Sequence, residues 1–260
     1  MEVPSLKHHL RRIVEGLALP ATVVLLWFFL AGQTANSFLL PGPGRVWRAG
    51  AELWQSGRLL RDLLASLGRV GVGFLLAAVL GLPLGFLIAR RRTFARIARG
   101  GLDFLRQIPP VALVPVLLLW LGLGEGAKLF VIVYAAFFPI LLAAELGVRQ
   151  VDPDLIEMGR LYHRRSEEIV WRVIVPYALP AMATGLRLGL GYGWRSLVVA
   201  EMLAAARGLG ALIVEARGFG RVDQMLVGVL AIGGAGLLLD WLLRLLESAL
   251  PWSGREGGAP

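Results

Sequence analysis

Apolar residues in this chain are gathered into long runs, and polar or turn-forming residues separate one run from the next. Each run has a length of about 17 to 25 residues, which is what an α-helix needs to cross the hydrocarbon core of a bilayer. Six runs of this kind are found, at residues 16–32, 66–89, 102–121, 129–148, 179–204 and 224–246. The pattern predicts an all-α integral membrane protein with six transmembrane helices.

Proline and glycine mark the breaks between these runs. Residues 38–44 read Phe-Leu-Leu-Pro-Gly-Pro-Gly, which a helix does not cross, so a loop is expected after the first span, and an amphipathic stretch at 46–64 leads into the second. The third run contains Pro109, Pro110 and Pro115, which remove backbone donors. This span is therefore predicted to be kinked and to lie inside the bundle, where neighbouring helices satisfy the freed carbonyls.

The N-terminal run has features of a signal peptide, because basic residues precede it. We interpret it as a retained first span, since the run is longer than a usual signal core and no small-x-small cleavage site follows. The predicted organisation is a cytoplasmic tail at 1–15, one transmembrane domain at 16–250 and a second cytoplasmic tail at 251–260.

Composition agrees with a lipid environment. The 260 residues are 57% hydrophobic with a mean hydropathy of +0.68, above the usual balance of a soluble domain. The net charge is +9, and all of the 27 basic residues except Lys7 and Lys128 are arginines. Nucleic-acid binding is not expected, because no basic stretch is interleaved with aromatic residues that stack on bases. The positive-inside rule explains the charge and places both termini in the cytoplasm, with the arginines of residues 90–99 and 149–172.

Several kinds of chemistry have no support in the sequence. Cysteine is absent, which excludes disulfides and thiolate zinc sites. Neither lysine lies in a phosphate-binding loop, and no His-Glu-x-x-His or Gly-x-Ser-x-Gly pattern occurs. The chain is therefore predicted to be no enzyme and to bind no metal or cofactor, so any ATP and Mg²⁺ that drive it must bind a partner.

The polar segment 149–178 predicts a helical hairpin between the fourth and fifth spans. Asp152 is the expected N-cap of a first helix that has Pro153 in its first turn and ends at Tyr162 or His163. Ser166 is the expected cap of a second helix, which Pro176 and Pro180 are expected to stop before the fifth span. A helical hairpin of this kind suits docking to a partner.

The same segment resembles a loop motif in permeases of ABC importers, which reads Glu-Ala-Ala, three residues, Gly, nine residues and Ile-x-Leu-Pro. The residues that match its spacing are Glu157-Met158-Gly159, His163, Val173 and Val175-Pro176. Met158 and Gly159 replace the alanines and His163 replaces the glycine, a position where histidine tolerates a left-handed backbone better than most residues do. The resemblance implies that the hairpin docks in a cleft of an ATPase. The residues that it implicates in coupling are Asp154, Glu157, Met158, Gly159, Tyr162, His163, Arg164, Val173 and Pro176.

Further motifs narrow the resemblance to the nitrate, sulfonate and taurine permease group. They are Leu40-Pro-Gly-Pro43, Ser66-Leu-Gly-Arg-Val70, Gly81-Leu-Pro-Leu-Gly85, Gln107-Ile-Pro-Pro110, Gly122-Leu-Gly124 and Ala200-Glu-Met202. The resemblance implies a type I importer permease fold in a bacterial inner membrane. It also implies three kinds of partner, namely a second copy of the chain, two ATP-binding cassette subunits that hold ATP and Mg²⁺, and a substrate-binding protein. A small anionic solute is expected, and an uncharged or cationic nutrient such as a thiamine-precursor-like molecule is the alternative substrate. Two other classes of protein are also alternatives, namely an ATPase-independent channel or carrier and a membrane enzyme.

The fifth span contains both small residues and charges. Gly185, Gly189 and Gly193 recur at intervals of four and predict a face for close helix packing rather than a ligand contact. Charges at membrane depth face a bundle interior or a water-filled cavity. We therefore predict that Arg195, Glu201 and Trp194 line or gate the path that the solute takes through the membrane. The alternative for the two charged residues is a structural salt bridge. In the sixth span, Asp240 and Arg244 predict a helix-surface ion pair.

Overall fold

The computed structural model describes residues 21–33, 39–162 and 165–248. The predicted tails at 1–15 and 251–260, and the coupling residues His163 and Arg164, lie outside the described residues. Within the described ranges, every regular element is helical.

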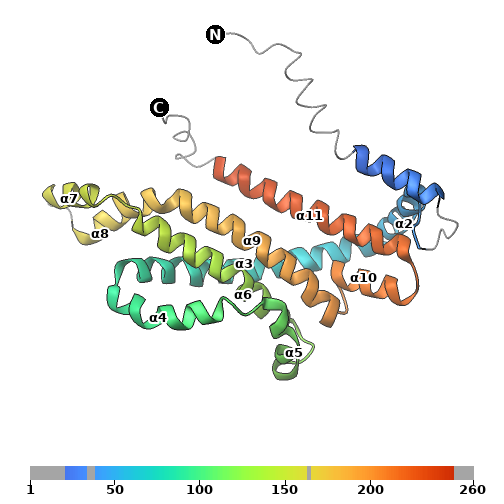
Figure 1. Ribbon diagram of the computed structural model, residues 1–260, viewed down its shortest axis with the longest axis horizontal. Helices are drawn as coiled ribbons and strands as arrows, with labels where there is room; N and C mark the ends of the chain where they lie inside the picture. The colour runs from blue at the N-terminus through green and yellow to red at the C-terminus, as the bar shows by residue number, and fades with distance from the viewer. Residues whose placement is uncertain (1–20, 34–38, 163–164, 249–260) are drawn as a thin grey trace, which may run out of the picture.

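A helix at Ala21–Gln33 precedes the elements labelled in Figure 1. Those elements are α2 (Pro43–Gln55), α3 (Arg58–Arg90), α4 (Arg92–Leu105), α5 (Pro110–Leu121), α6 (Glu125–Arg149), α7 (Pro153–Leu161), α8 (Ser166–Ile169), α9 (Val175–Ala204), α10 (Leu209–Gly218) and α11 (Val222–Ser248). A π-helical turn at Val170–Ile174 joins α8 to α9.

Helices α3, α6 and α9 form the centre of the bundle, with α6 packed against both of the others (Figure 1). The contact between α9 and α6 depends on three buried glycines. Gly185, Gly189 and Gly193 lie against Ala143, Ile140 and Ile132 of α6, at distances that leave little or no room for a side chain. Small residues therefore allow the two backbones to approach closely.

The third predicted span is not one helix. The chain breaks between α4 and α5, and these two helices meet at 89°. Pro109 caps α5 in an extended conformation and Pro110 opens its first turn, so the paired prolines end one helix and start another instead of kinking a continuous one. In addition, α4 begins at Arg92, ten residues before the predicted start at 102.

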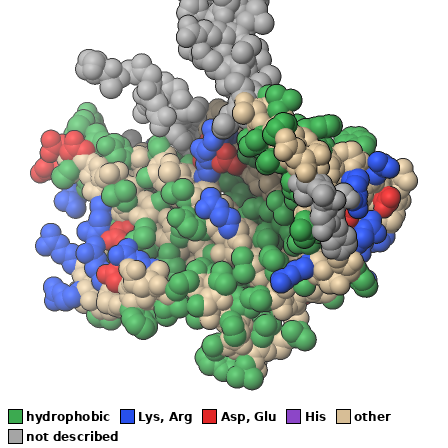
Figure 2. All heavy atoms as spheres, turned by 45° about the vertical axis from the view of Figure 1, so that its right-hand side comes forward, with side chains coloured by type: hydrophobic (Ala, Val, Ile, Leu, Met, Phe, Trp, Pro, Cys, Tyr) green, Lys and Arg blue, Asp and Glu red, His purple; other side chains and the backbone are tan. Residues whose placement is uncertain are grey.

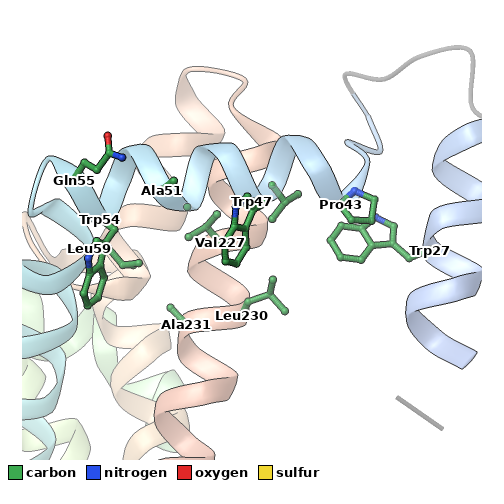
Figure 3. A pocket seen from close by; sticks show the side chains of 12 residues that line it. Trp27, Pro43, Trp47, Ala51, Trp54, Gln55, Leu59, Val227, Leu230 and Ala231 are labelled. Atoms are coloured by element: carbon green, nitrogen blue, oxygen red, sulfur yellow. The ribbon is translucent and has the colours of Figure 1, made fainter. Parts of the chain in front are cut away.

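The amphipathic stretch at 46–64 is also divided. Gly57 has a φ of 67°, a left-handed conformation that glycine adopts without steric cost, and it separates α2 from α3. Helix α2 packs Val46, Ala49 and Leu53 onto Leu212 and Val227. Its tryptophans line an apolar groove of about 650 Å³, where Figure 3 shows Trp47 and Trp54 of α2 with Trp27 of the preceding helix. Tryptophans on an amphipathic helix are typical of a membrane–water boundary.

Four helical segments are long and apolar enough to cross a membrane, namely Arg58–Arg90, Glu125–Arg149, Ser166–Ala204 and Val222–Ser248. The bent pair of α4 and α5 gives a fifth candidate if it counts as one span. Figure 2 shows apolar side chains over much of the middle of the visible face, with most of the lysines and arginines towards its two sides and a few near its centre. The all-helical, multi-span character of the prediction is confirmed, and the arrangement with six spans stays a prediction.

Candidate functional site

The first helix of the hairpin forms as its sequence predicts. The Asp152 side chain caps α7 by accepting a hydrogen bond from the backbone N–H of Asp154 at 2.9 Å, and Pro153 lies in the first turn. The helix ends at Leu161 with Tyr162 as its C-cap, in agreement with the predicted end. A side-chain cap and a proline at N1 thus fix the start of the segment that carries Glu157.

The second helix differs from the prediction. Ser166 is the first residue of α8 rather than its cap, and the residue at the cap position is Arg165, which makes no side-chain capping bond. Pro176 and Pro180 do not stop this helix, because both lie within α9, which continues from α8 through the π-helical turn. The wider turn before Pro176 accommodates a residue that cannot donate to the preceding carbonyls.

The hairpin presents one side of α7 to its surroundings and packs the other. Glu157 is exposed, and so are Met158 (52%) and Tyr162 (76%). Gly159 is buried against Ile169 of α8, whose Cγ1 would lie 3.3 Å from a Cβ at this position. The exposed part of the hairpin therefore carries a carboxylate together with a large apolar and an aromatic side chain, and the glycine sets the distance between α7 and α8. Of the other predicted coupling residues, Asp154 and Pro176 are exposed and Val173 is partly buried.

A buried carboxylate lies at the opposite end of α9. Glu201 is 1% exposed and accepts hydrogen bonds from the Ser66 hydroxyl of α3, whose Oγ is 2.8 and 2.9 Å from its two oxygens. It also accepts from the Nη1 of Arg69 at 2.7 Å and from the backbone N–H of Gly210 at 3.0 Å. A buried charge is tolerated when it is paired and hydrogen-bonded in this way.

The loop between α9 and α10 is fastened to α3 by the same group of residues. The backbone N–H of Gly208 donates to Asp62 at 3.1 Å, and that of Leu209 donates to the Ser66 hydroxyl at 3.0 Å. Gly208 has a φ of 131°, and a Cβ there would overlap the Glu201 carboxylate. Glycine is therefore required at this position for both its conformation and its size.

Arg69 extends this arrangement to α6. Its Nε and Nη2 donate to Glu125 at 2.6 and 3.0 Å, and its Nη1 also donates to the carbonyl of Arg207 at 2.7 Å. The buried Lys128 pairs with Glu125 at 2.7 Å. We call the resulting set the Glu201 network; it joins α3, α6, α9 and α10 and comprises Asp62, Ser66, Arg69, Glu125, Lys128, Glu201, Gly208, Leu209 and Gly210.

The three residues predicted to line the path have different environments. Arg195 is exposed, with its guanidinium 5.5 Å from the centre of the Tyr192 ring. Trp194 is buried, and its indole N–H donates to the carbonyl of Ile232 on α11 at 3.3 Å. Glu201 forms a buried salt bridge, and its basic partner is Arg69 rather than Arg195.

The ion pair predicted within α11 has a further member on α9 that was not predicted. Asp240 accepts from Arg244 at 2.9 Å, which confirms the predicted pair. Asp240 also accepts from Arg187 of α9 at 2.5 Å, so this carboxylate joins two helices instead of serving α11 alone.

The sequence reasoning identified Glu201 but missed most of its network. The available signal was that Arg69 and Glu201 each place a charge within an apolar helix, and such charges tend to pair with one another. Both also lie in the motifs that carried the resemblance, Ser66–Val70 and Ala200–Met202. The backbone contacts of Gly208 and Leu209 have no comparable pattern in the sequence.

Comparison with known proteins identifies the fold and the family. The family described as "Binding-protein-dependent transport system inner membrane component" matches residues 81–250. This chain belongs to that family. It is therefore a permease subunit of an ABC importer, a multi-pass component of the inner membrane, as its hairpin motif predicted.

Two relatives confirm the predicted subgroup. The permease is 35% identical to a putative aliphatic sulfonates transport permease protein of Bacillus subtilis, over 91% of this chain and 86% of the relative. It is 33% identical to a taurine transport system permease protein of Escherichia coli, over 94% and 91%. Among solved structures, the MetNI methionine ABC transporter in an inward-facing conformation has a similar fold, with a TM-score of 0.60 and 20% identity over 74% of this permease and 97% of that chain.

Proposed function

We propose that this permease forms the membrane path for a small anionic solute and is driven by separate ATPase subunits that dock on α7. The observation that carries the proposal is the exposure of α7 and its C-cap, where Glu157, Met158 and Tyr162 are all accessible to a partner. Exposed apolar residues around a charge are typical of a surface that a protein partner covers. In this arrangement two copies of the chain share one path, and each hairpin engages one ATPase subunit, which holds ATP and Mg²⁺.

The proposed topology has six spans with both termini in the cytoplasm. Two features support this orientation. The arginine-rich junction of α3 and α4 lies at the same end of the molecule as α7 and α8 (Figure 1), and Arg90, Arg92, Arg149 and Arg160 line one cavity there. Basic residues concentrate on the cytoplasmic side of membrane proteins. A substrate-binding protein then delivers the solute at the opposite end, where the Glu201 network lies.

A second cavity supports the position of the path. It has a volume of about 530 Å³ and lies between α5, α6 and α9, with Tyr134, Tyr192, Gln107 and Arg106 among its lining residues. Arg195 is exposed beside Tyr192, which adds positive charge near this cavity. Positive charge next to polar and aromatic groups favours an anion such as a sulfonate, taurine or nitrate over a cation.

Purification of the tagged permease from its native membrane tests the docking of an ATPase. ATPase activity is measured in the eluate of the unchanged protein, of Glu157→Ala and of the control Glu52→Ala, which removes an exposed carboxylate from α2. We expect the unchanged protein and the control to retain an ATPase that Glu157→Ala loses. Solute transport by the purified chain alone, with no ATPase recovered under mild detergent, would instead establish the channel or carrier alternative.

Uptake by the reconstituted complex tests the solute class. We expect an aliphatic sulfonate, taurine or nitrate to be transported and Arg195→Ala to slow uptake more than Arg195→Lys does, because lysine keeps the positive charge. Efficient uptake of an uncharged or cationic nutrient, with no response to either substitution, would contradict the anion assignment.

A further inference from the structure

The cavity beside the hairpin has a volume of about 580 Å³ and is separate from the one proposed as part of the path. It lies between the hairpin and the junction of α3 and α4. Four arginines from four elements line it, with Arg90 at the end of α3, Arg92 at the start of α4, Arg149 at the end of α6 and Arg160 on α7. No Asp or Glu is among its lining residues. The cavity therefore concentrates positive charge from segments that are far apart in the sequence.

Little of this charge is neutralised within the protein. Arg149 donates to Glu145 at 2.9 Å, and Glu145 also accepts from Arg99 at 2.8 Å, so one carboxylate serves two arginines. The guanidinium of Arg90 lies 5.9 Å from the centre of the Phe86 ring. Within the described part of the chain, Arg90, Arg92 and Arg160 form no ion pair.

The positive-inside rule accounts for arginines at this boundary but not for their convergence on a cavity. Arg91 and Arg96 belong to the same basic segment and are exposed, yet neither lines the cavity. Guanidinium groups are planar forks that bind phosphate oxygens in pairs, and several of them around one concavity form a phosphate site. Lining the cavity thus distinguishes the arginines that could bind a phosphate from the other arginines of the same basic segment.

Apart from Ser166, the rest of the lining is apolar. Val148, Val151, Ile156, Ile169 and Ile174 contribute to it, and the cavity lies where the long apolar helices α3 and α6 end. A free phosphate would contact the arginines and Ser166 and leave the apolar residues uncovered, whereas a phospholipid offers both a phosphate and the apolar acyl chains that follow its glycerol. A basic pocket at the end of transmembrane helices is a typical place for such a headgroup.

We propose that this cavity binds the headgroup of an anionic phospholipid, with the phosphate held by Arg90, Arg92 and Arg160. The bound lipid bridges the junction of α3 and α4 to α7 and neutralises charges that repel one another. It therefore holds the hairpin against the bundle, so the stability of the hairpin depends on the lipid composition of the membrane.

Native mass spectrometry of the full-length permease tests this inference. The protein is exchanged from phosphatidylcholine into mixtures that contain phosphatidylglycerol, and the fraction that retains one phosphatidylglycerol is measured. The double variant Arg92→Gln/Arg160→Gln removes two arginines of the cavity, and the control Arg91→Gln/Arg96→Gln removes the same charge beside it. Loss of two charge-assisted contacts is expected to weaken retention by about tenfold or more in the first variant only.

Thermal melting gives a second readout. In phosphatidylcholine alone, the control is expected to melt like the unchanged protein, and Arg92→Gln/Arg160→Gln is expected to melt no lower, since its side chains are exposed and their mutual repulsion is removed. Phosphatidylglycerol should raise the melting temperature of the unchanged protein and the control but not that of Arg92→Gln/Arg160→Gln.

Equal loss of retention in both variants would show nonspecific charge attraction and overturn the proposal. Inorganic phosphate that raises the melting temperature of the unchanged protein as much as phosphatidylglycerol does would overturn it in favour of a free-anion site.

Discussion

Glu201 on α9 and Arg69 on α3 are 132 residues apart in the sequence, and their side chains meet at 2.7 Å inside the protein. Arg69 also binds Glu125 of α6, so a single guanidinium joins three helices of the central bundle. A charge buried in this way is stable only with its partners, because removing one of them leaves the other without compensation. A substitution at either residue is therefore expected to affect the packing of α3, α6 and α9 at this end of the bundle.

Replacing Glu201 is expected to destabilise the permease. Glu201→Ala leaves Ser66, Gly210 and part of Arg69 without an acceptor, at a cost of about 3–5 kcal/mol, whereas Glu201→Gln keeps an acceptor and costs less. Thermal melting in detergent measures the difference. The matched control is Glu52→Gln, since that carboxylate is exposed on α2. A melting temperature for Glu201→Ala equal to that of the control would show that the network contributes nothing to stability.

The close approach of Gly208 to the Glu201 carboxylate leads to a second prediction. Gly208→Ala places a Cβ on the carboxylate and imposes strain at a φ of 131°, so a loss of about 2–5 kcal/mol is expected from overpacking and backbone strain together. Gly218→Ala at the end of α10 is the control, because a Cβ there meets nothing within 4 Å. Denaturation of both variants, followed by the fluorescence of the tryptophans, checks the expected order. If the two alanines proved equally harmless, the close approach of Gly208 to Glu201 would be refuted.

The long apolar helices were predictable from the sequence, whereas two of the junctions between helices were not. Long apolar runs fix where α3, α6, α9 and α11 form, because such runs have few other stable conformations in lipid. The break between α4 and α5 depends on whether neighbouring elements support a kink at Pro109, and the π-helical turn before Pro176 depends on packing of the hairpin. Both features depend on tertiary packing, which the local periodicity of the sequence does not encode.

The same limit applies to the site. The α7 cap at Asp152 was predictable because a cap and its helix are adjacent in sequence. The partners of Glu201 were not, because Ser66 and Arg69 lie on another helix and Gly210 contributes only its backbone. Sequence reasoning therefore found the charge but not the group that neutralises it.

Packing between α9 and α6 gives a third prediction. In Gly189→Ala, the new Cβ would lie 2.7 Å from Cγ1 of Ile140 and 2.9 Å from the carbonyl oxygen of Ala136, so α9 must move away from α6. We expect a loss of about 1–3 kcal/mol, as for other overpacked interiors. Gly191→Ala serves as the control, since its nearest neighbour is the flexible end of Arg195 at 3.8 Å. Melting curves that show no difference between these two alanines would contradict the close contact.

The last prediction concerns the spacing of α7 and α8. Gly159→Val forces its side chain into Ile169, which would already lie 3.3 Å from a Cβ, and so tilts α7 away from α8. Because α7 lies at the end of the bundle, we expect the melting temperature to change little while the recovered ATPase activity falls at least severalfold. The double variant Gly159→Val/Ile169→Ala restores space on the facing helix and should recover part of that activity, since substitutions at contacting residues are not additive. An ATPase that copurifies equally well with Gly159→Val would show that docking tolerates a displaced α7. Failure of the Ile169→Ala rescue, with the protein still folded, would place the effect of Gly159 outside its contact with Ile169.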